Sequence, residues 1–164
     1  MKSRQITKDD IIDMLADIPD PEVPVINIVE LGIVRDAAID GDEIVVKITP
    51  TYSGCPAMNM IERQIVDHLS THGLDNVSIK TVYAPAWTTD WITEEAKQKL
   101  KDYGIAPPGM VMDQDLFDFK PRPVSCPQCD SDDTKRQSEF GSTPCKSQYF
   151  CNNCHQPFEH FKCH

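Results

Sequence analysis

Four of the seven cysteines in this 164-residue chain occur as two closely spaced pairs. The pairs are the Cys-x-x-Cys motifs "CPQC" at 126–129 and "CNNC" at 151–154, separated by 21 residues. Four thiolates with this spacing can surround one Zn²⁺ ion tetrahedrally, at about 2.3 Å from the metal. Iron, as a single ion or a cluster, is the competing metal because four cysteine sulfurs hold it equally well. The predicted ligands, with zinc favoured, are Cys126, Cys129, Cys151 and Cys154.

The segment that carries these motifs, residues 124–164, is about 40 residues long. This is near the size at which a hydrophobic core alone no longer sustains a fold. Zinc ligation contributes on the order of 10 kcal/mol to the folding of such small domains, so we predict a zinc ribbon built from two β-hairpins. A zinc ion with four protein ligands keeps no open position, and the ribbon is therefore expected to be a scaffold or docking surface.

Other potential metal ligands lie outside the paired motifs. Cys145 is either a small buried hydrophobe or an additional ligand. Cys163 and His164 are expected to form a frayed tail. His68 and His72 are one helical turn apart and could bind a metal, although histidines in this pattern are more often solvated.

Cys55 stands apart from the other cysteines, in the stretch "TPTYSGCPAM" between Gly54 and Pro56. Proline is favoured in the first turn of a helix, so the order strand, Gly, Cys, Pro, helix places Cys55 at or next to a helix N-cap. The positive end of the helix dipole would lower the pKa of the thiol and favour a thiolate. Such a thiolate can attack an electrophile, be oxidised or bind a soft metal. The alternative is a cysteine that only fills the core.

Local signals around Cys55 predict an α+β domain with helices on one face of a mixed three- to four-stranded sheet. Apolar residues recur at helical spacing in three segments and alternate or cluster in three others. The predicted elements are a helix capped by Thr7 and ended by Pro19, strands at 33–39 and 44–49 joined by an Asp-Gly turn, a helix at 58–69 stopped by Gly73, a strand at 77–82, and a helix at 92–103 with its cap at Thr89 or Asp90.

These patterns divide the chain into three parts. Residues 1–106 are the predicted α/β domain, 107–123 a proline-rich linker, and 124–164 the zinc ribbon. Within the linker, Leu116, Phe117 and Phe119 could dock on the first domain.

Composition restricts the partners and the location that we expect. The formal charge is −10, and no basic face is evident, which argues against nucleic acid and anionic membranes as partners. We find no signal-peptide pattern and no run approaching the roughly 20 apolar residues of a membrane span. An odd number of cysteines also suits a reducing compartment better than a disulfide framework. The expectation is a soluble protein of the cytoplasm.

Three stretches of the first domain resemble a known family. "DPEVPVINIVELGIV" (20–34), "TPTYSGCPAM" (49–58) and "APAWTTDWIT" (84–93) resemble the small iron–sulfur maturation domains that include bacterial SufT and the eukaryotic cytosolic iron–sulfur targeting factors. With the cysteine-rich tail, the whole chain is similar to the PaaD-type accessory proteins of phenylacetyl-CoA epoxidase systems. The resemblance implies a compact α/β domain that helps to deliver iron or clusters to client enzymes.

The resemblance also implies site residues. It assigns the reactive cysteine to Cys55, an acidic loop beside it to Asp20 and Glu22, and an aromatic motif to Trp87, Thr88, Asp90 and Trp91. In a simpler interpretation, the tryptophans are core or interface anchors and Asp90 is a helix cap. A cluster normally needs four ligands, so any cluster on Cys55 is expected to be transient. Its other ligands would come from a second copy in a homodimer, a partner, a small thiol or Cys145.

Three classes of function follow. The favoured one is a maturation factor that works with the iron–sulfur assembly machinery and serves the epoxidase, through its 2Fe–2S reductase or its di-iron oxygenase subunit. The second is a structural adaptor of the epoxidase complex, held by zinc, in which Cys55 is incidental. The third is an enzyme with a cysteine nucleophile, but no His, Asp or Asn stands in an obvious partnering motif, so we expect no catalysis.

Overall fold

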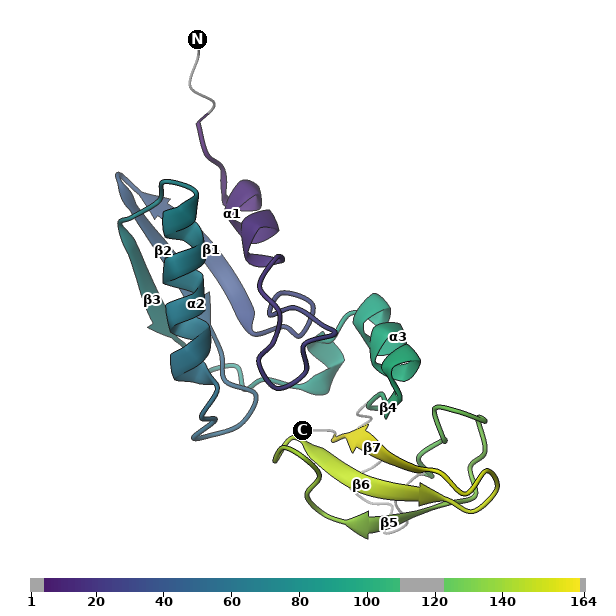
Figure 1. Cartoon of the computed structure of the whole chain (residues 1–164). Helices are drawn as coiled ribbons and strands as arrows, with labels where there is room; N and C mark the ends of the chain where they lie inside the picture. Colours follow the sequence, from purple (N-terminus) through teal and green to yellow (C-terminus); the bar gives the residue numbers. More distant parts are fainter. Residues whose placement is uncertain (1–4, 110–122, 163–164) are drawn as a thin grey trace. The chain divides into compact units, whose positions relative to one another are not determined.

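The computed structural model describes residues 5–109 and 123–162, and the chain forms two compact units, Met1–Trp87 and Thr88–His164 (Figure 1). The first unit contains α1 (Lys8–Leu15), β1 (Val34–Asp40), β2 (Glu43–Ile48), α2 (Met58–Thr71) and β3 (Val77–Thr81). The second contains the 3₁₀ turn η1 (Thr89–Trp91), α3 (Glu94–Tyr103), β4 (Ile105–Ala106), β5 (Thr134–Ser138), β6 (Lys146–Cys151) and β7 (Pro157–Phe161). Among the described residues, no helix combines the length and apolar character that crossing a bilayer requires.

The first unit is built on a mixed sheet with the strand order β1-β2-β3. β1 and β2 are antiparallel, and β3 runs parallel to β2. Asp40 pairs with Glu43 across the hairpin, and Gly41 has a φ of 62°, which a two-residue turn of this kind requires. The predicted hairpin and mixed sheet are confirmed.

Helices α1 and α2 supply the apolar layer that covers the sheet. α2 packs against β3, and α1 contacts both α2 and β1 (Figure 1). Every second residue of β2 is buried, so one face of the sheet meets the helices. The buried side chains from α2 and β2 are Ile61, Ile65, Leu69, Ile44, Val46 and Ile48.

The second unit has a four-stranded sheet with the order β4-β7-β6-β5. The antiparallel pairs β5–β6 and β6–β7 form the two predicted hairpins, and β4 pairs in parallel with β7. Ala106 of β4 lies in the same buried cluster as Cys126, Cys151 and Phe158. The compact unit Thr88–His164 thus includes α3 and β4 together with the ribbon strands. The domain bounds expected from the sequence, 1–106 and 124–164, stay a prediction.

The start of α3 differs from the sequence prediction, whereas its end agrees with it. Its N-cap is Thr93, whose hydroxyl accepts a hydrogen bond from the Ala96 N–H, so the cap predicted at Thr89 or Asp90 is wrong. Thr88 instead caps the short η1 turn that precedes α3. At the other end Gly104 adopts a left-handed conformation, with a φ of 92°, as expected for a glycine that stops a helix.

Most of the predicted linker lies outside the described residues. This includes Leu116, Phe117 and Phe119, so their docking on the first domain stays a prediction.

Candidate functional site

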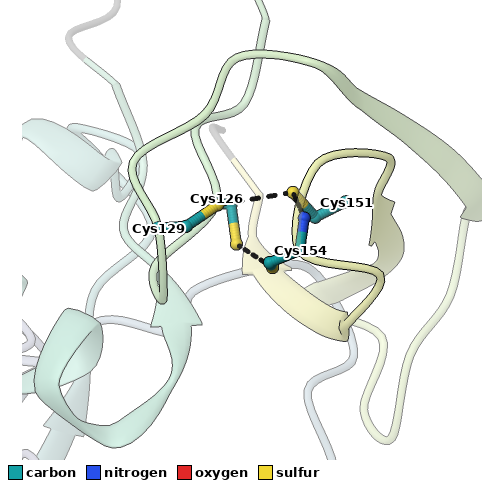
Figure 2. Close-up of side chains that lie close together, drawn as sticks. All are labelled: Cys126, Cys129, Cys151 and Cys154. Atoms are coloured by element: carbon teal, nitrogen blue, oxygen red, sulfur yellow. Dashed lines mark hydrogen bonds between the residues drawn. The ribbon is translucent and has the colours of Figure 1, made fainter.

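The four cysteines of the two Cys-x-x-Cys motifs converge from two turns, one before β5 and one between β6 and β7 (Figure 2). Their sulfur atoms all lie within 4.8 Å of one another. The Sγ atoms of Cys126 and Cys154 are 3.7 Å apart, and those of Cys129 and Cys151 are 3.6 Å apart. An ion with tetrahedral bonds of 2.3 Å places its sulfurs roughly 3.8 Å apart. The arrangement therefore fits a metal ion of this type.

Both turns have the same backbone design. The N–H of Asp130 donates to the carbonyl of Cys126 at 2.9 Å, and the N–H of His155 donates to that of Cys151 at 3.0 Å. Asp130 and His155 have φ values of 57° and 60°, a left-handed conformation that costs a non-glycine residue roughly 1–2 kcal/mol. The repeated geometry directs the two sulfurs of each motif to the same side of their turn.

The surroundings of the four sulfurs shift the pKa values of Cys129 and Cys154 in opposite directions. The Asn153 amide and the Ser131 N–H lower the pKa of Cys129 to about 6. The Gln156 N–H lowers the pKa of Cys154, but burial and the three neighbouring cysteines outweigh it and raise that pKa to about 12. Without a cation the four sulfurs cannot all be charged at neutral pH. Metal binding would therefore release protons from this site.

The remaining cysteines of the second unit are separate from this group. The Cys145 sulfur lies 3.0 Å from the Thr143 hydroxyl, and its side chain is buried. It is not among the cysteines that could share a metal within the described residues. Cys163 and His164 lie outside the described residues. None of the six described cysteines forms a disulfide bond.

Cys55 lies in the connection between β2 and α2, at the end of a tight turn. Its N–H donates to the carbonyl of Tyr52 at 3.3 Å, and Gly54 at the third position of this turn has a φ of 80°. This is the pattern of a type II turn, which needs glycine at that position. A Cβ at Gly54 would meet nothing within 4 Å, so the positive φ, and not lack of space, is what favours glycine here.

The expected thiolate at Cys55 is not supported. Burial raises the pKa of the Cys55 thiol, and the nearby Glu22 carboxylate raises it further. The Ala57 N–H and the hydroxyls of Tyr52 and Thr51 lower the pKa but do not compensate. The physical reason is position, because the N-cap of α2 is Ala57 and Cys55 precedes it by two residues. The helix dipole acts mainly within the first turn.

Asp20 shapes the loop that brings Glu22 near the cysteine. Its buried carboxylate accepts hydrogen bonds from the N–H groups of Glu22 and Val23, at 2.9 and 2.7 Å. The Asp20 N–H in turn donates to the carbonyl of Ile26 at 2.9 Å. Asp20 is thus an organiser of the loop, whereas Glu22 acts on Cys55 through its charge.

Two residues of the aromatic motif, Trp87 and Asp90, lie in different surroundings. Trp87 is buried, and its indole N–H donates to the carbonyl of Leu31 at 2.9 Å. This agrees with the simpler interpretation of Trp87 as a core anchor. Asp90 is exposed, and its N–H donates to the Thr88 hydroxyl, so it receives a cap and does not provide one.

Two family models match this chain. Residues 8–84 match the model described as iron-sulfur cluster assembly protein, and residues 115–162 match the PaaD zinc beta ribbon domain. Over 150 residues the chain is 44% identical to a protein of Escherichia coli (strain K12) whose name places it provisionally within 1,2-phenylacetyl-CoA epoxidase, as one of its subunits. The alignment covers 92% of this chain and 89% of that protein. The chain belongs to the PaaD family.

Shorter proteins resemble part of this PaaD-family chain. The Fe-S protein maturation auxiliary factor of Porphyromonas gingivalis is 34% identical over 96 residues, which is 57% of this chain and 90% of that protein. A DUF59 domain of unknown function from Bacillus anthracis aligns with a TM-score of 0.53 at 28% identity, covering 57% of this chain and 90% of its own. A conserved hypothetical protein of Thermotoga maritima aligns with a TM-score of 0.51 at 29% identity, and the alignment covers 60% of this chain and 97% of that protein.

The residues that sequence reasoning missed all act on sulfur through hydrogen bonds. Thr51 and Tyr52 lower the pKa of Cys55, and Ser131 and Asn153 that of Cys129. Each of the four lies close in sequence to a candidate cysteine. Thr51 and Tyr52 precede Cys55 by four and three residues, Ser131 follows Cys129 by two, and Asn153 precedes Cys154 by one. For Thr51, Tyr52 and Asn153, a polar side chain this close to a candidate ligand is a signal that could have pointed to them. Ser131 acts through its backbone N–H, which the residue type does not reveal.

Proposed function

We propose that this PaaD-family chain is an accessory factor of a phenylacetyl-CoA epoxidase system, and that it passes iron or an iron–sulfur cluster to a client subunit through Cys55. The observation that carries the proposal is the match over 92% of the chain to a protein named as a subunit of that epoxidase. The match of residues 8–84 to iron-sulfur cluster assembly proteins supports the second part.

The surroundings of Cys55 suit a cation better than an electrophile. Burial and the charge of Glu22 both raise the pKa of the thiol, so at neutral pH the sulfur is a poor nucleophile. A metal cation reverses this balance, because it displaces the thiol proton and is attracted by the same carboxylate. Iron is here the cargo of the protein.

One sulfur cannot hold iron or a cluster alone. An iron–sulfur cluster takes four protein ligands, and Cys55 is the one cysteine of the first unit. The remaining ligands come from a client, from a second copy or from a small thiol. Binding of this kind is weak and short-lived, which suits transfer between assembly machinery and client.

The ribbon has a different part in the proposal. Zinc held by Cys126, Cys129, Cys151 and Cys154 stabilises the second unit and leaves no position open for chemistry. A closed zinc site and a Cys55 thiol that is a poor nucleophile both support an accessory role over an enzymatic one. The clients of the protein are the epoxidase reductase or the di-iron oxygenase subunit, and the ribbon is the surface through which it docks.

The test compares the iron content of the client subunits. Epoxidase components are co-produced with the wild-type chain, with Cys55→Ser, or with Ser53→Ala, a change at an exposed neighbour in the same turn. We expect Cys55→Ser to yield clients deficient in iron, while Ser53→Ala and wild type agree. Full iron and full epoxidase activity with Cys55→Ser would leave a structural adaptor as the function.

A further inference from the structure

We propose that His68 and His72 of α2, with Asp17, form a second and separate site for a divalent first-row metal ion of the nickel or zinc type. The site lies within the first unit and does not depend on the function proposed above. The two imidazole rings are 4.8 Å apart between centroids and tilted by 56°. As they stand, the three side chains do not form a closed set of ligands, which among the described residues the four ribbon cysteines do. Side chains four residues apart on a helix share one face, so rotation of the side chains would let both rings bind one ion.

The hydrogen bonds of His72 prepare one of its nitrogens for a metal. Its Nδ1 lies 2.9 Å from the carbonyl oxygen of His68 and 3.2 Å from the Thr71 hydroxyl, which itself donates to the same carbonyl. A carbonyl only accepts, so Nδ1 carries the proton of the neutral ring and Nε2 keeps its lone pair. A backbone hydrogen bond that fixes the tautomer in this way is the usual support of a metal-binding histidine. His72 is exposed, so the lone pair on Nε2 is open to an ion.

His68 has a nitrogen that the described structure leaves without a hydrogen bond. Its Nε2 is shielded from solvent and has no hydrogen-bond partner among the described residues. The nearest charge is the Asp17 carboxylate, whose Oδ2 lies 3.9 Å away. Two ligand atoms on an ion with bonds of about 2.1 Å lie roughly 3.0–3.4 Å apart. The Asp17 side chain is 73% exposed and can move by the small distance required.

The donor set selects the chemical class of the ion. Imidazole nitrogens suit zinc, copper, nickel and iron, and affinity rises from iron towards nickel and copper. The site has no thiolate, so it competes little with the cysteine site for soft ions. Ni²⁺ is therefore a suitable probe once the ribbon has received its zinc.

The experiment is a calorimetric titration of the full-length, zinc-loaded chain with Ni²⁺ at about pH 7.5, above the usual histidine pKa. We expect one Ni²⁺ per chain, and at least about tenfold weaker binding in both His68→Gln and His72→Gln, because each removes one arm of a chelate. Asp17→Asn should weaken binding more than Asp67→Asn, which removes the same charge from an exposed position of α2.

Other outcomes overturn the proposal. Wild-type affinity in either histidine variant would show that the rings do not act together, and loss of binding in Cys55→Ser would place the ion elsewhere. His72 is exposed, so His72→Gln tests the site without a risk to the fold. As an independent measurement, ¹⁵N NMR of the metal-free site should find the His72 proton on Nδ1, and a proton on Nε2 would contradict the argument.

Discussion

Replacing Asp20 should loosen the loop that holds Glu22 near Cys55. Asp20 is 4% exposed, and one of its carboxylate oxygens accepts two backbone N–H groups at 2.9 and 2.7 Å. Hydrogen bonds to a charged group contribute about 1.5–3 kcal/mol each, and an amide left unpaired in a buried place costs a similar amount. Because both bonds share one oxygen, we expect Asp20→Ala to lose about 3 kcal/mol of the first unit's stability. Asp20→Asn keeps an acceptor oxygen and should lose about half as much.

Hydrogen exchange measured on peptides of the full-length protein can test this. A loss of 3 kcal/mol corresponds to roughly 100-fold faster exchange where global unfolding of the unit limits the rate. Peptides from β2 and α2 should show this acceleration in Asp20→Ala, whereas β6 peptides from the second unit serve as the internal control. If β2 and α2 exchange within threefold of wild type, the two hydrogen bonds do not hold the loop and the reasoning is refuted.

Two further predictions concern the sulfur sites. Removing the metal by a chelator, or by Cys151→Ser, should unfold the second unit, because structural zinc supplies on the order of 10 kcal/mol. Hydrogen exchange should then become faster in β5–β7 and stay unchanged in α2. Ribbon strands that remain protected in the metal-free protein would contradict this prediction. Glu22→Gln should lower the pKa of Cys55, since the carboxylate raises it. The rate of alkylation of Cys55 between pH 7 and 9 should then be higher in Glu22→Gln than in wild type, and an unchanged profile would mean that the charge of Glu22 does not reach the thiol.

The parts of the fold that could be predicted from sequence depend on local signals. The Asp-Gly turn between β1 and β2 and the glycine at the end of α3 act on the backbone of their own neighbours, and both occur where expected. The metal site was equally accessible, because two ligands three residues apart come from one turn. Only the approach of the two turns to each other depends on the fold of the whole segment. Even this approach was expected, because a segment of this size needs a metal or another cross-link to be stable.

One error is local, and two others arise where distant residues decide the outcome. The sequence offers several neighbouring capping residues, and the cap predicted at Thr89 or Asp90 lies instead at Thr93, while Thr88 caps a separate turn. β4 could not be assigned from its own residues, since its pairing partner β7 comes about 50 residues later in the chain. The pKa of Cys55 was expected to fall, yet burial and Glu22, which lies 33 positions earlier, reverse the direction. Sequence patterns do not show the contacts that β4 and Cys55 make with these distant residues.

The raised pKa of Cys55 changes what its sulfur is suited to do. A nucleophile needs the thiolate at rest, and burial with a neighbouring carboxylate opposes that. For the proposed transfer of iron the same property is favourable, because a proton competes with the metal for the sulfur. When a client offers its own thiolates, protonation of Cys55 helps the cargo to leave. The four ribbon cysteines have the opposite character, since their mutual fit, with sulfurs 3.6 and 3.7 Å apart, completes the coordination of an ion and favours keeping it.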